Sequence, residues 1–304
     1  QVYDIARNTG AYLIEQLGVD RTPVAVFAGR KMVTPAYFLG VVYAGRPYAP
    51  IDASLPDKRI EKILENLCPR AIVADRESLE HVESIVDELA KAEGFDRPQI
   101  FIAEDISRFE QVACADSNCK ISESAGDAVT DSENDTDGGV VAGCAGKIDD
   151  SSRDMLAVVR RQMSMTDPLY IIYTSGSTGN PKGVMTSHLS LMTYINAYCD
   201  VMHIEESDVL GNQSPLDYIA AIRDIYLPLK TGCSTAIIPK EYFMEPNALF
   251  DYMNDKKVSS VGWSVSAFTI LTSLGAFEEV GLKSLRKICF SGSVMPCRVL
   301  RKWQ

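Results

Sequence analysis

A short segment in the second half of the chain carries the side chains needed to hold phosphate groups. It reads YTSGSTGNPKG from Tyr173 to Gly183 and follows an apolar run. Glycines let the backbone approach an anion closely and take positive φ angles. Hydroxyls and free N–H groups donate to phosphate oxygens, and lysine supplies a compact positive charge. The candidate phosphate ligands are Thr174, Ser175, Gly176, Ser177, Thr178, Gly179 and Lys182.

Two common phosphate-binding motifs do not fit this segment. A Walker A loop needs Gly-Lys-Ser/Thr at the start of a helix, whereas Lys182 lies between Pro181 and Gly183. The glycine spacing also differs from the Gly-x-Gly-x-x-Gly of dinucleotide-binding folds. The alternative is a flexible Ser/Gly turn, but such a turn has little use for a lysine fixed after proline in a dense group of hydroxyls. The segment therefore predicts a polyphosphate-binding loop of another kind.

The elements around this loop are short β-rich runs that alternate with segments of helical spacing. This alternation predicts the α/β class, with mostly parallel sheets covered by helices. The expected strands cover residues 23–29, 71–75, 99–105, 169–176, 235–240, 259–266 and 287–293. The expected helices cover residues 34–45, 55–67, 77–92, 187–198 and 247–255. In the helix over 55–67 the apolar face consists of Ile60, Ile63, Leu64 and Leu67.

The chain has 304 residues and a formal net charge of −11, and much of the acidic excess falls within residues 116–154. That stretch is rich in Ser, Gly, Ala and Asp and has no aromatic residue. It cannot bury enough apolar area to offset roughly 1–2 kcal/mol of backbone entropy per ordered residue. We therefore expect a first α/β part over 1–105, an acidic, largely disordered insertion over 106–165, and a second α/β part with the phosphate loop over 166–304.

Composition argues against several classes of protein. The acidic pI, near 4.9, disfavours binding to nucleic acid or to anionic lipid. No apolar run approaches the roughly 20 residues of a membrane helix, and no secretory signal is visible at the start. The eight cysteines lack a disulfide-framework spacing and predict reduced thiols in a cytoplasmic protein. Cys114, Cys119 and Cys144 are too loosely spaced for a zinc site, so we interpret them as incidental thiols.

The loop sequence YTSGSTGNPKG closely resembles the phosphate loop of the adenylate-forming (AMP-binding) superfamily. This superfamily includes acyl-CoA ligases, luciferases and the adenylation domains that load carrier proteins. VVYAGRPYAPIDASLPDKRIEKIL, over 41–64, resembles the segment that amino-acid adenylation domains carry ahead of that loop. The region 212–229 and the stretches TAIIPK and VGWSVSAF resemble D-alanyl carrier protein ligases and peptide-synthetase relatives. The resemblance covers nearly all of the chain outside 106–165.

The resemblance implies an AMP-forming acid–thiol ligase acting on an amino acid or amino-acid-like acid. The carboxylate attacks the α-phosphorus of Mg-ATP, giving an acyl-adenylate and pyrophosphate, and a thiol on the phosphopantetheine arm of a carrier protein then takes the acyl group. The loop residues would hold the β- and γ-phosphates, with Thr174 and Ser175 closest to Mg²⁺. The implied fold is the large N-terminal core of these enzymes without their C-terminal subdomain.

One departure concerns the substrate amine. In amino-acid-activating relatives an Asp pairs with the α-ammonium, and alignment from Asn212 and from Asp224 puts Ile219 at that position. Asp217 stands two residues earlier and would share a strand face with it, because strand side chains repeat every second residue. Either the acid lacks an α-amino group, as an aryl, fatty or hydroxy acid does, or Asp217 serves instead. The remaining interpretation of Asp217 is a surface carboxylate after Pro215.

Three further positions follow from the resemblance. FSGSVMP, over 290–296, stands where relatives carry Gly-Gly-Glu or Cys-Gly-Glu in the adenine and substrate pocket. Ser291, Gly292 and Ser293 are therefore nucleotide-pocket candidates, with Ser293 in place of the acid. His188 corresponds to a histidine that approaches the acyl pocket in relatives, with helix capping or packing as the alternative. Trp263 lies in a β-rich run, where a core position and a pocket wall are both open.

The chain stops at Gln304, before the segments that carry this superfamily's metal-binding Glu, ribose-binding Asp and catalytic Lys. We therefore expect the catalytic residues beyond Gln304 and interpret the chain as an incomplete fragment. The first alternative is a non-catalytic truncated copy with at most nucleotide binding. A CoA ligase for an aryl or fatty acid is the second, and a phosphotransferase that uses the same loop is the third.

Overall fold

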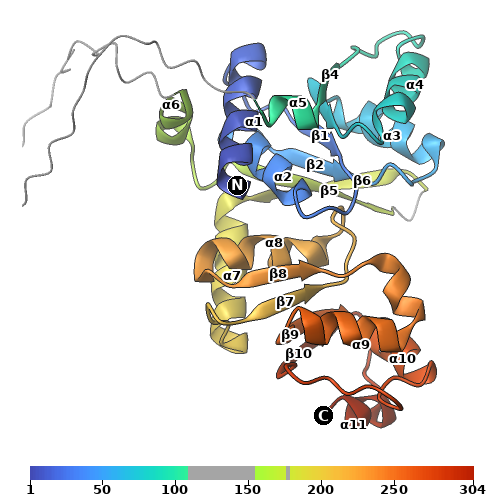
Figure 1. The fold of residues 1–304 in the computed structure, drawn as a ribbon. Coiled ribbons are helices and arrows are strands. Elements are labelled where there is room, and N and C mark those ends of the chain that lie inside the picture. The colour runs from blue at the N-terminus through green and yellow to red at the C-terminus, as the bar shows by residue number, and fades with distance from the viewer. Residues whose placement is uncertain (109–154, 176–178) are drawn as a thin grey trace, which may run out of the picture.

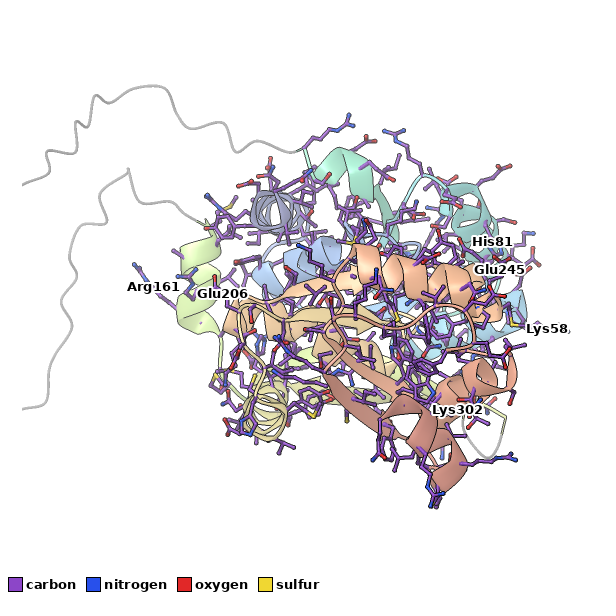
Figure 2. All side chains as sticks on the ribbon, turned by 60° about the horizontal axis from the view of Figure 1, so that its bottom comes forward. Lys58, His81, Arg161, Glu206, Glu245 and Lys302 are labelled. Carbon is purple, nitrogen blue, oxygen red and sulfur yellow. The ribbon has the colours of Figure 1, made fainter. Side chains whose placement is uncertain are left out.

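The computed structural model describes residues 1–108, 155–175 and 179–304. Two sheets with helices on their faces make up the molecule, and the chain passes from the first to the second after a long hairpin (Figure 1). Long charged side chains such as Arg161, Glu206 and Lys302 point outward from the periphery (Figure 2). Most of the expected insertion, and the loop residues Gly176, Ser177 and Thr178, lie outside the described residues.

The first sheet has six strands in the order β4-β3-β1-β2-β5-β6. Its strands are β1 (Val24–Phe27), β2 (Tyr48–Ile51), β3 (Ala71–Ala74), β4 (Gln99–Ile102), β5 (Pro168–Ser175) and β6 (Pro181–Ser187). All neighbours are parallel except β5 and β6, which form an antiparallel hairpin. Val24 and Val26 face one core cluster while Ala25 and Phe27 face another, as the two-residue period of a strand requires. Both faces are thus buried, which explains the continuous apolar run.

Helices cover both faces of this sheet. They are α1 (Val2–Leu17), α2 (Thr34–Tyr43), α3 (Asp57–Leu67), α4 (Leu79–Leu89), α5 (Ala103–Ile106) and α6 (Met155–Gln162). The predicted apolar face of α3 is buried, whereas its remaining positions carry mostly charged side chains. In α6, Leu156 and Val159 join the same core cluster as residues of α1 and α2. Well-packed helical structure therefore begins by residue 155, inside the segment expected to be an insertion.

The second sheet is entirely parallel, with the order β10-β9-β7-β8. Its strands are β7 (Val209–Asn212), β8 (Ser234–Ile237), β9 (Ser260–Ser264) and β10 (Lys287–Ser291). Its helices are α7 (His188–Met202), α8 (Ile219–Thr231), the 3-10 helix η2 (Lys240–Met244), α9 (Pro246–Asp255), α10 (Val265–Ser273) and α11 (Cys297–Trp303). Trp303 packs edge-on against Trp263, Phe250 and Phe268. The end of the chain is thereby fixed in the core of this part.

The predicted α/β class with parallel, helix-covered sheets is confirmed. The strand expected over 99–105 ends at Ile102, and a helical turn with Glu104 and Asp105 in its first turn begins there. Strands β2, β6 and β7 were not predicted, because each is short or lacks an apolar alternation. Within the described ranges, no helix combines the length and apolar character needed to cross a membrane. Cys68, Cys199, Cys233, Cys289 and Cys297 are free thiols, and the other three cysteines lie outside those ranges.

Candidate functional site

The predicted phosphate loop joins the two strands of the β5–β6 hairpin. Thr174 pairs with Lys182 and Ser175 with Pro181, so both flanks of the loop are fixed by the register of the sheet. Gly179 has a φ of +78°, a conformation that other residues rarely adopt. Because β5 runs parallel to β2, the loop emerges at the carboxyl edge of the first sheet. Ligands of open α/β sheets usually bind at this edge.

The side chains of Thr174, Ser175 and Lys182 are exposed and have spare hydrogen-bonding capacity. Thr174 Oγ1 lies 3.4 Å from the carbonyl oxygen of Lys182, the long limit of a hydrogen bond. The Lys182 ammonium forms no ion pair with any residue that the structure describes. An exposed ammonium beside free hydroxyls can bind the charged oxygens of a phosphate chain. The geometry of Thr174, Ser175 and Lys182 therefore fits the predicted role.

Two basic residues of α3 flank the loop, and the sequence reasoning missed them. Arg59 Nη1 lies 3.5 Å from Ser175 Oγ, and Lys62 Nζ donates to Asn180 Oδ1 at 3.0 Å. Tyr173 fixes the hairpin on the same helix by donating to Asn66 Oδ1 at 2.8 Å. Arg59 and Lys62 stand three residues apart, on one face of a helix. The sequence shows this spacing, but it does not show that the two residues lie close to the loop.

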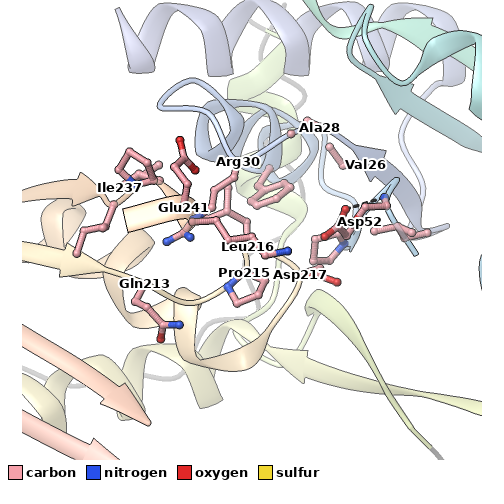
Figure 3. A pocket seen from close by; sticks show the side chains of 18 residues that line it. Val26, Ala28, Arg30, Asp52, Gln213, Pro215, Leu216, Asp217, Ile237 and Glu241 are labelled. Atoms are coloured by element: carbon pink, nitrogen blue, oxygen red, sulfur yellow. Dashed lines mark hydrogen bonds between the residues drawn. The ribbon is translucent and has the colours of Figure 1, made fainter. Parts of the chain in front are cut away.

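A cavity of about 560 Å³ opens between the two sheets (Figure 3). Its walls are the loops that follow β1, β2, β7 and β8, so it lies at the carboxyl edges of both sheets. The polar lining residues are Arg30, Asp52, Ser54, Gln213, Asp217, Lys240 and Glu241. Of these, the sequence reasoning singled out Asp217 alone. Arg30 and Glu241 come immediately after two of the predicted strands, 23–29 and 235–240, so their positions were visible in the sequence.

Asp217 lines this cavity, and its carboxylate feels the charge of Arg59 on α3. Burial and the neighbouring Asp52 carboxylate raise the pKa of Asp217, and the Arg59 guanidinium opposes that rise. Arg59 in turn lies against Ser175. Arg59 therefore acts electrostatically on Asp217 and also lies against Ser175 of the hairpin.

The expectation that Asp217 and Ile219 share a strand face is wrong. Residues 215–218 form a turn in which Tyr218 N–H donates to the Pro215 carbonyl, and α8 begins at Ile219. Ile219 is 47% exposed and does not line the cavity. Between the two candidates, Asp217 is the one whose side chain borders an enclosed space.

Arg30 connects the two sheets across the cavity. Its Nη2 donates to the Asn212 carbonyl at 2.7 Å and to Asn212 Oδ1 at 2.9 Å. Its Nε is buried and has no hydrogen-bond acceptor in the described structure. Burial lowers the pKa of Arg30, whereas Asp224 and Glu241 raise it. The guanidinium therefore remains charged and only partly paired.

The predicted nucleotide-pocket residues lie at one end of the second sheet. Ser291, Gly292 and Ser293 are exposed at the carboxyl end of β10, and Gly292 has a φ of +99°. Ser291 ends β10, the outer strand of the second sheet, and Gly292 and Ser293 follow it. No hydrogen bond in the described part of the chain joins these residues to the hairpin. Like the phosphate loop, these residues lie at the carboxyl edge of a sheet.

The surroundings of His188 and Trp263 fit a structural role rather than a place in a binding site. His188 opens α7 at the far end of β6, about 20 Å from Lys182 at the usual rise of a strand. Burial lowers the pKa of His188, and Asp167 opposes that shift. Trp263 is 1% exposed, and its indole N–H donates to the Gly211 carbonyl at 2.8 Å. This packing favours the core interpretation of Trp263, and neither residue lines a described cavity.

Comparison with known proteins decides the family. The family model described as "AMP-binding enzyme" matches residues 1–304. The chain belongs to the AMP-binding enzyme family. The resemblance drawn from YTSGSTGNPKG is thereby confirmed.

Relatives within the AMP-binding family include D-alanine–D-alanyl carrier protein ligases. Those of Bacillus cereus (strain AH187) and Bacillus anthracis (strain CDC 684 / NRRL 3495) are 26% and 27% identical over 284 residues. The alignments cover 93% of this chain and 46% of each relative. The chain therefore spans about half the length of the curated relatives it matches.

Solved structures of the family share the fold. The four-domain nonribosomal peptide synthetase AB3403, bound to AMP and glycine, superposes with a TM-score of 0.68 at 20% identity, over 99% of this chain and 18% of that chain. The N-terminal domain of FACL13 from Mycobacterium tuberculosis gives 0.71 at 17% identity, over 100% and 65%. ATP-bound MatB from Rhodopseudomonas palustris gives 0.70 at 16% identity, over 99% and 51%.

Proposed function

We propose that this chain is the ATP-holding part of an enzyme that activates a carboxylic acid as its acyl-adenylate. The observation that carries the proposal is the β5–β6 hairpin, where exposed hydroxyls and Lys182, which forms no ion pair with any described residue, emerge beside Arg59 and Lys62. Membership of the AMP-binding family supports the same activity. ATP supplies a leaving group for a carboxylate that is otherwise a poor electrophile.

The residues of the hairpin would act by binding and orienting phosphates. Lys182 would neutralise charge on the β- and γ-phosphates, and Thr174 and Ser175 would donate from their hydroxyls. The backbone at Gly179 would approach an oxygen closely, since no side chain intervenes. Gly176, Ser177 and Thr178 would complete the cradle. Ser291, Gly292 and Ser293 remain candidates for the nucleotide's base.

Magnesium fits this arrangement as an ion held chiefly by the nucleotide. The described residues contain no group of three or more His, Cys, Asp or Glu suited to a metal. Mg²⁺ usually keeps several waters and takes few protein ligands beside substrate phosphates. The hydroxyls of Thr174 and Ser175 would supply oxygen ligands beside the phosphates, without a larger protein cage.

The acid would bind on the cavity side of the hairpin, with Asp217 as the partner of an amine where the acid has one. The matched D-alanyl carrier protein ligases favour a carrier-protein thiol as the acceptor. Free CoA is the alternative acceptor, as in a CoA ligase for an aryl or fatty acid.

Pyrophosphate exchange into ATP tests the proposal directly. The full-length protein is offered acids with and without an amino group, and we expect exchange that depends on both acid and Mg²⁺. Product analysis then separates AMP with pyrophosphate from the ADP of a phosphotransferase. A full-length protein that binds ATP without exchange for any acid would instead be the non-catalytic copy. Thioester formation on a carrier protein, compared with free CoA, identifies the acceptor.

A further inference from the structure

A polar stripe on α3 lies along the phosphate hairpin. It consists of Arg59, Lys62 and Asn66, which stand three and then four residues apart and so share one side of the helix. The buried apolar residues of α3 lie on the adjacent side. Each member of the stripe meets a different position of the hairpin, in this order: Ser175, Asn180 and Tyr173. The helix therefore supports the hairpin at three points, one of which joins two uncharged side chains.

Gly183 leaves room for the Tyr173 ring on the hairpin. The two residues are register partners in β6 and β5. A Cβ built on Gly183 would stand 3.1 Å from Tyr173 Cζ and 2.9 Å from Ile171 Cγ2, so any larger residue would displace one of these side chains. The ring also packs against the core cluster to which α3 contributes its apolar face. The position of the ring is thus fixed by packing, and its hydroxyl meets α3 at Asn66.

The hydrogen bond between Tyr173 and Asn66 is insensitive to the conditions that weaken the other two contacts. Burial raises the pKa of Tyr173 to about 12, so the hydroxyl keeps its proton throughout the neutral range. Its oxygen lies 2.8 Å from Asn66 Oδ1, a normal distance for an O–H···O bond. Salt screens exposed charges such as Lys62, whereas a bond between two uncharged groups is not screened. This contact can therefore be separated from the charged ones by experiment.

We propose that Tyr173 is a positioning residue for ATP, because its hydrogen bond to Asn66 holds the hairpin in the conformation that receives the phosphates. The proposal rests on the proposed function. Thr174 and Ser175 follow Tyr173 directly in β5, so an anchored Tyr173 fixes the strand end from which both hydroxyls project. A hairpin without this anchor must be ordered when ATP binds, and that ordering lowers the apparent affinity.

A purely structural role for this hydrogen bond makes a different prediction. Loss of a structural bond lowers the free energy of unfolding and leaves the KM for ATP unchanged. Loss of a positioning bond raises the KM for ATP, because a smaller fraction of the hairpins is ready to bind. The value of kcat then stays nearly constant, because saturating ATP restores the bound arrangement. A comparison of KM with kcat therefore distinguishes the two roles.

Pyrophosphate exchange by the full-length protein, at varied ATP and saturating acid, tests the assignment. We expect Tyr173→Phe and Asn66→Ala each to raise the KM for ATP about two- to tenfold, the fold-change that one uncharged hydrogen bond supplies. The value of kcat should stay within about twofold. The double variant should be no worse than either single variant, because both changes remove the same bond. Each increase should persist at high salt.

Tyr252→Phe is the matched control, because the Tyr252 hydroxyl donates to the Ile237 carbonyl at 3.0 Å in the second sheet. It loses a comparable hydrogen bond and should leave the KM for ATP unchanged. An unchanged KM in Tyr173→Phe and Asn66→Ala, or effects that add in the double variant, would overturn the assignment. Exchange by the wild type with no change in these variants contradicts the positioning role alone. Absence of exchange by the wild type with every acid contradicts acid activation itself.

Discussion

The guanidinium of Arg223 occupies the space that a side chain at Gly262 would need. A Cβ built on Gly262 would stand 2.1 Å from Arg223 Nη1, and Arg223 Nη2 donates to the Gly262 carbonyl at 2.8 Å. The same guanidinium pairs with the Asp224 carboxylate at 2.7 Å. Arg223 and Asp224 are both buried, so this charged pair has little room to move.

Gly262→Ala should therefore destabilise the protein by about 1–3 kcal/mol, as expected when a packed core receives an extra methyl group. The free energy of unfolding from denaturant titration is the measurement. Gly281→Ala is the matched control, because a Cβ at Gly281 would meet nothing within 4 Å. Equal stability of the two variants would show that Arg223 moves aside freely.

Because Asp208 is buried in a charged network, we expect the free energy of unfolding to depend on pH. Its carboxylate is fully buried and accepts hydrogen bonds from Lys287, Ser259 and Arg286 at 2.6, 2.6 and 2.9 Å. These partners hold the pKa of Asp208 well below its usual value. The stabilisation is therefore complete above the unfolded pKa, near 4, and is lost as the pH falls toward the lower folded pKa.

Asp208→Asn should lower the unfolding free energy at pH 7 by about 2 kcal/mol, since it removes one partner of a buried charge network. The difference from wild type should shrink between about pH 4 and pH 2. Asp251→Asn, at an exposed position, is the control. A constant difference across this pH range would contradict the account.

Lys182→Ala and Thr174→Ala, each in the full-length protein, should slow adenylation. Loss of a contact to a developing charge costs on the order of 2–4 kcal/mol, which corresponds to roughly 30- to 1,000-fold in rate. Pyrophosphate exchange at saturating acid gives the rate. Lys256→Ala removes an exposed lysine that pairs with Asp255 and should leave exchange unchanged. Normal exchange in the Lys182 variant would disprove the phosphate assignment.

Arg59→Ala and Lys62→Ala should weaken ATP binding rather than the chemical step. Each removes a cation near the hairpin, half-buried for Arg59 and exposed for Lys62, so a loss of up to about 1 kcal/mol, or about fivefold in Kd, is expected. The effect should fade as salt is added, because exposed charges are screened. Lys58→Ala, on the outward side of the same helix, is the control (Figure 2). Salt-independent losses would indicate a packing defect instead.

Deletion of residues 116–154 should change the melting temperature little, because loop-closure entropy grows only with the logarithm of loop length. This prediction is based on the composition of the acidic stretch, because the stretch lies outside the described residues. Differential scanning calorimetry of the deletion variant gives the answer. A large fall in melting temperature would mean that the stretch is packed.

The spacing of apolar residues was enough to predict a buried face where that face belongs to a single helix. The face of α3 formed by Ile60, Ile63, Leu64 and Leu67 is buried as predicted, because helical spacing alone selects it. β6 was missed because it is an edge strand, with Lys182, Val184 and Met185 exposed, and thus lacks an alternating pattern.

The site was only partly predictable for a physical reason. The loop motif is contiguous, so its residue types indicate phosphate binding without a structure. The cavity gathers loops that follow four strands, and Arg30 meets Asn212 across 182 positions of sequence. Arg59 reaches Ser175 across 116 positions. No local pattern encodes such pairings, which arise from the order of strands in the two sheets.

The central claim is that the β5–β6 hairpin holds the triphosphate of a nucleotide. The most direct measurement is a crystal structure of the full-length protein soaked with Mg-ATP. The account predicts triphosphate density beside Thr174, Ser175 and Lys182. Density for the triphosphate elsewhere on the molecule, with the hairpin intact and empty, would contradict it.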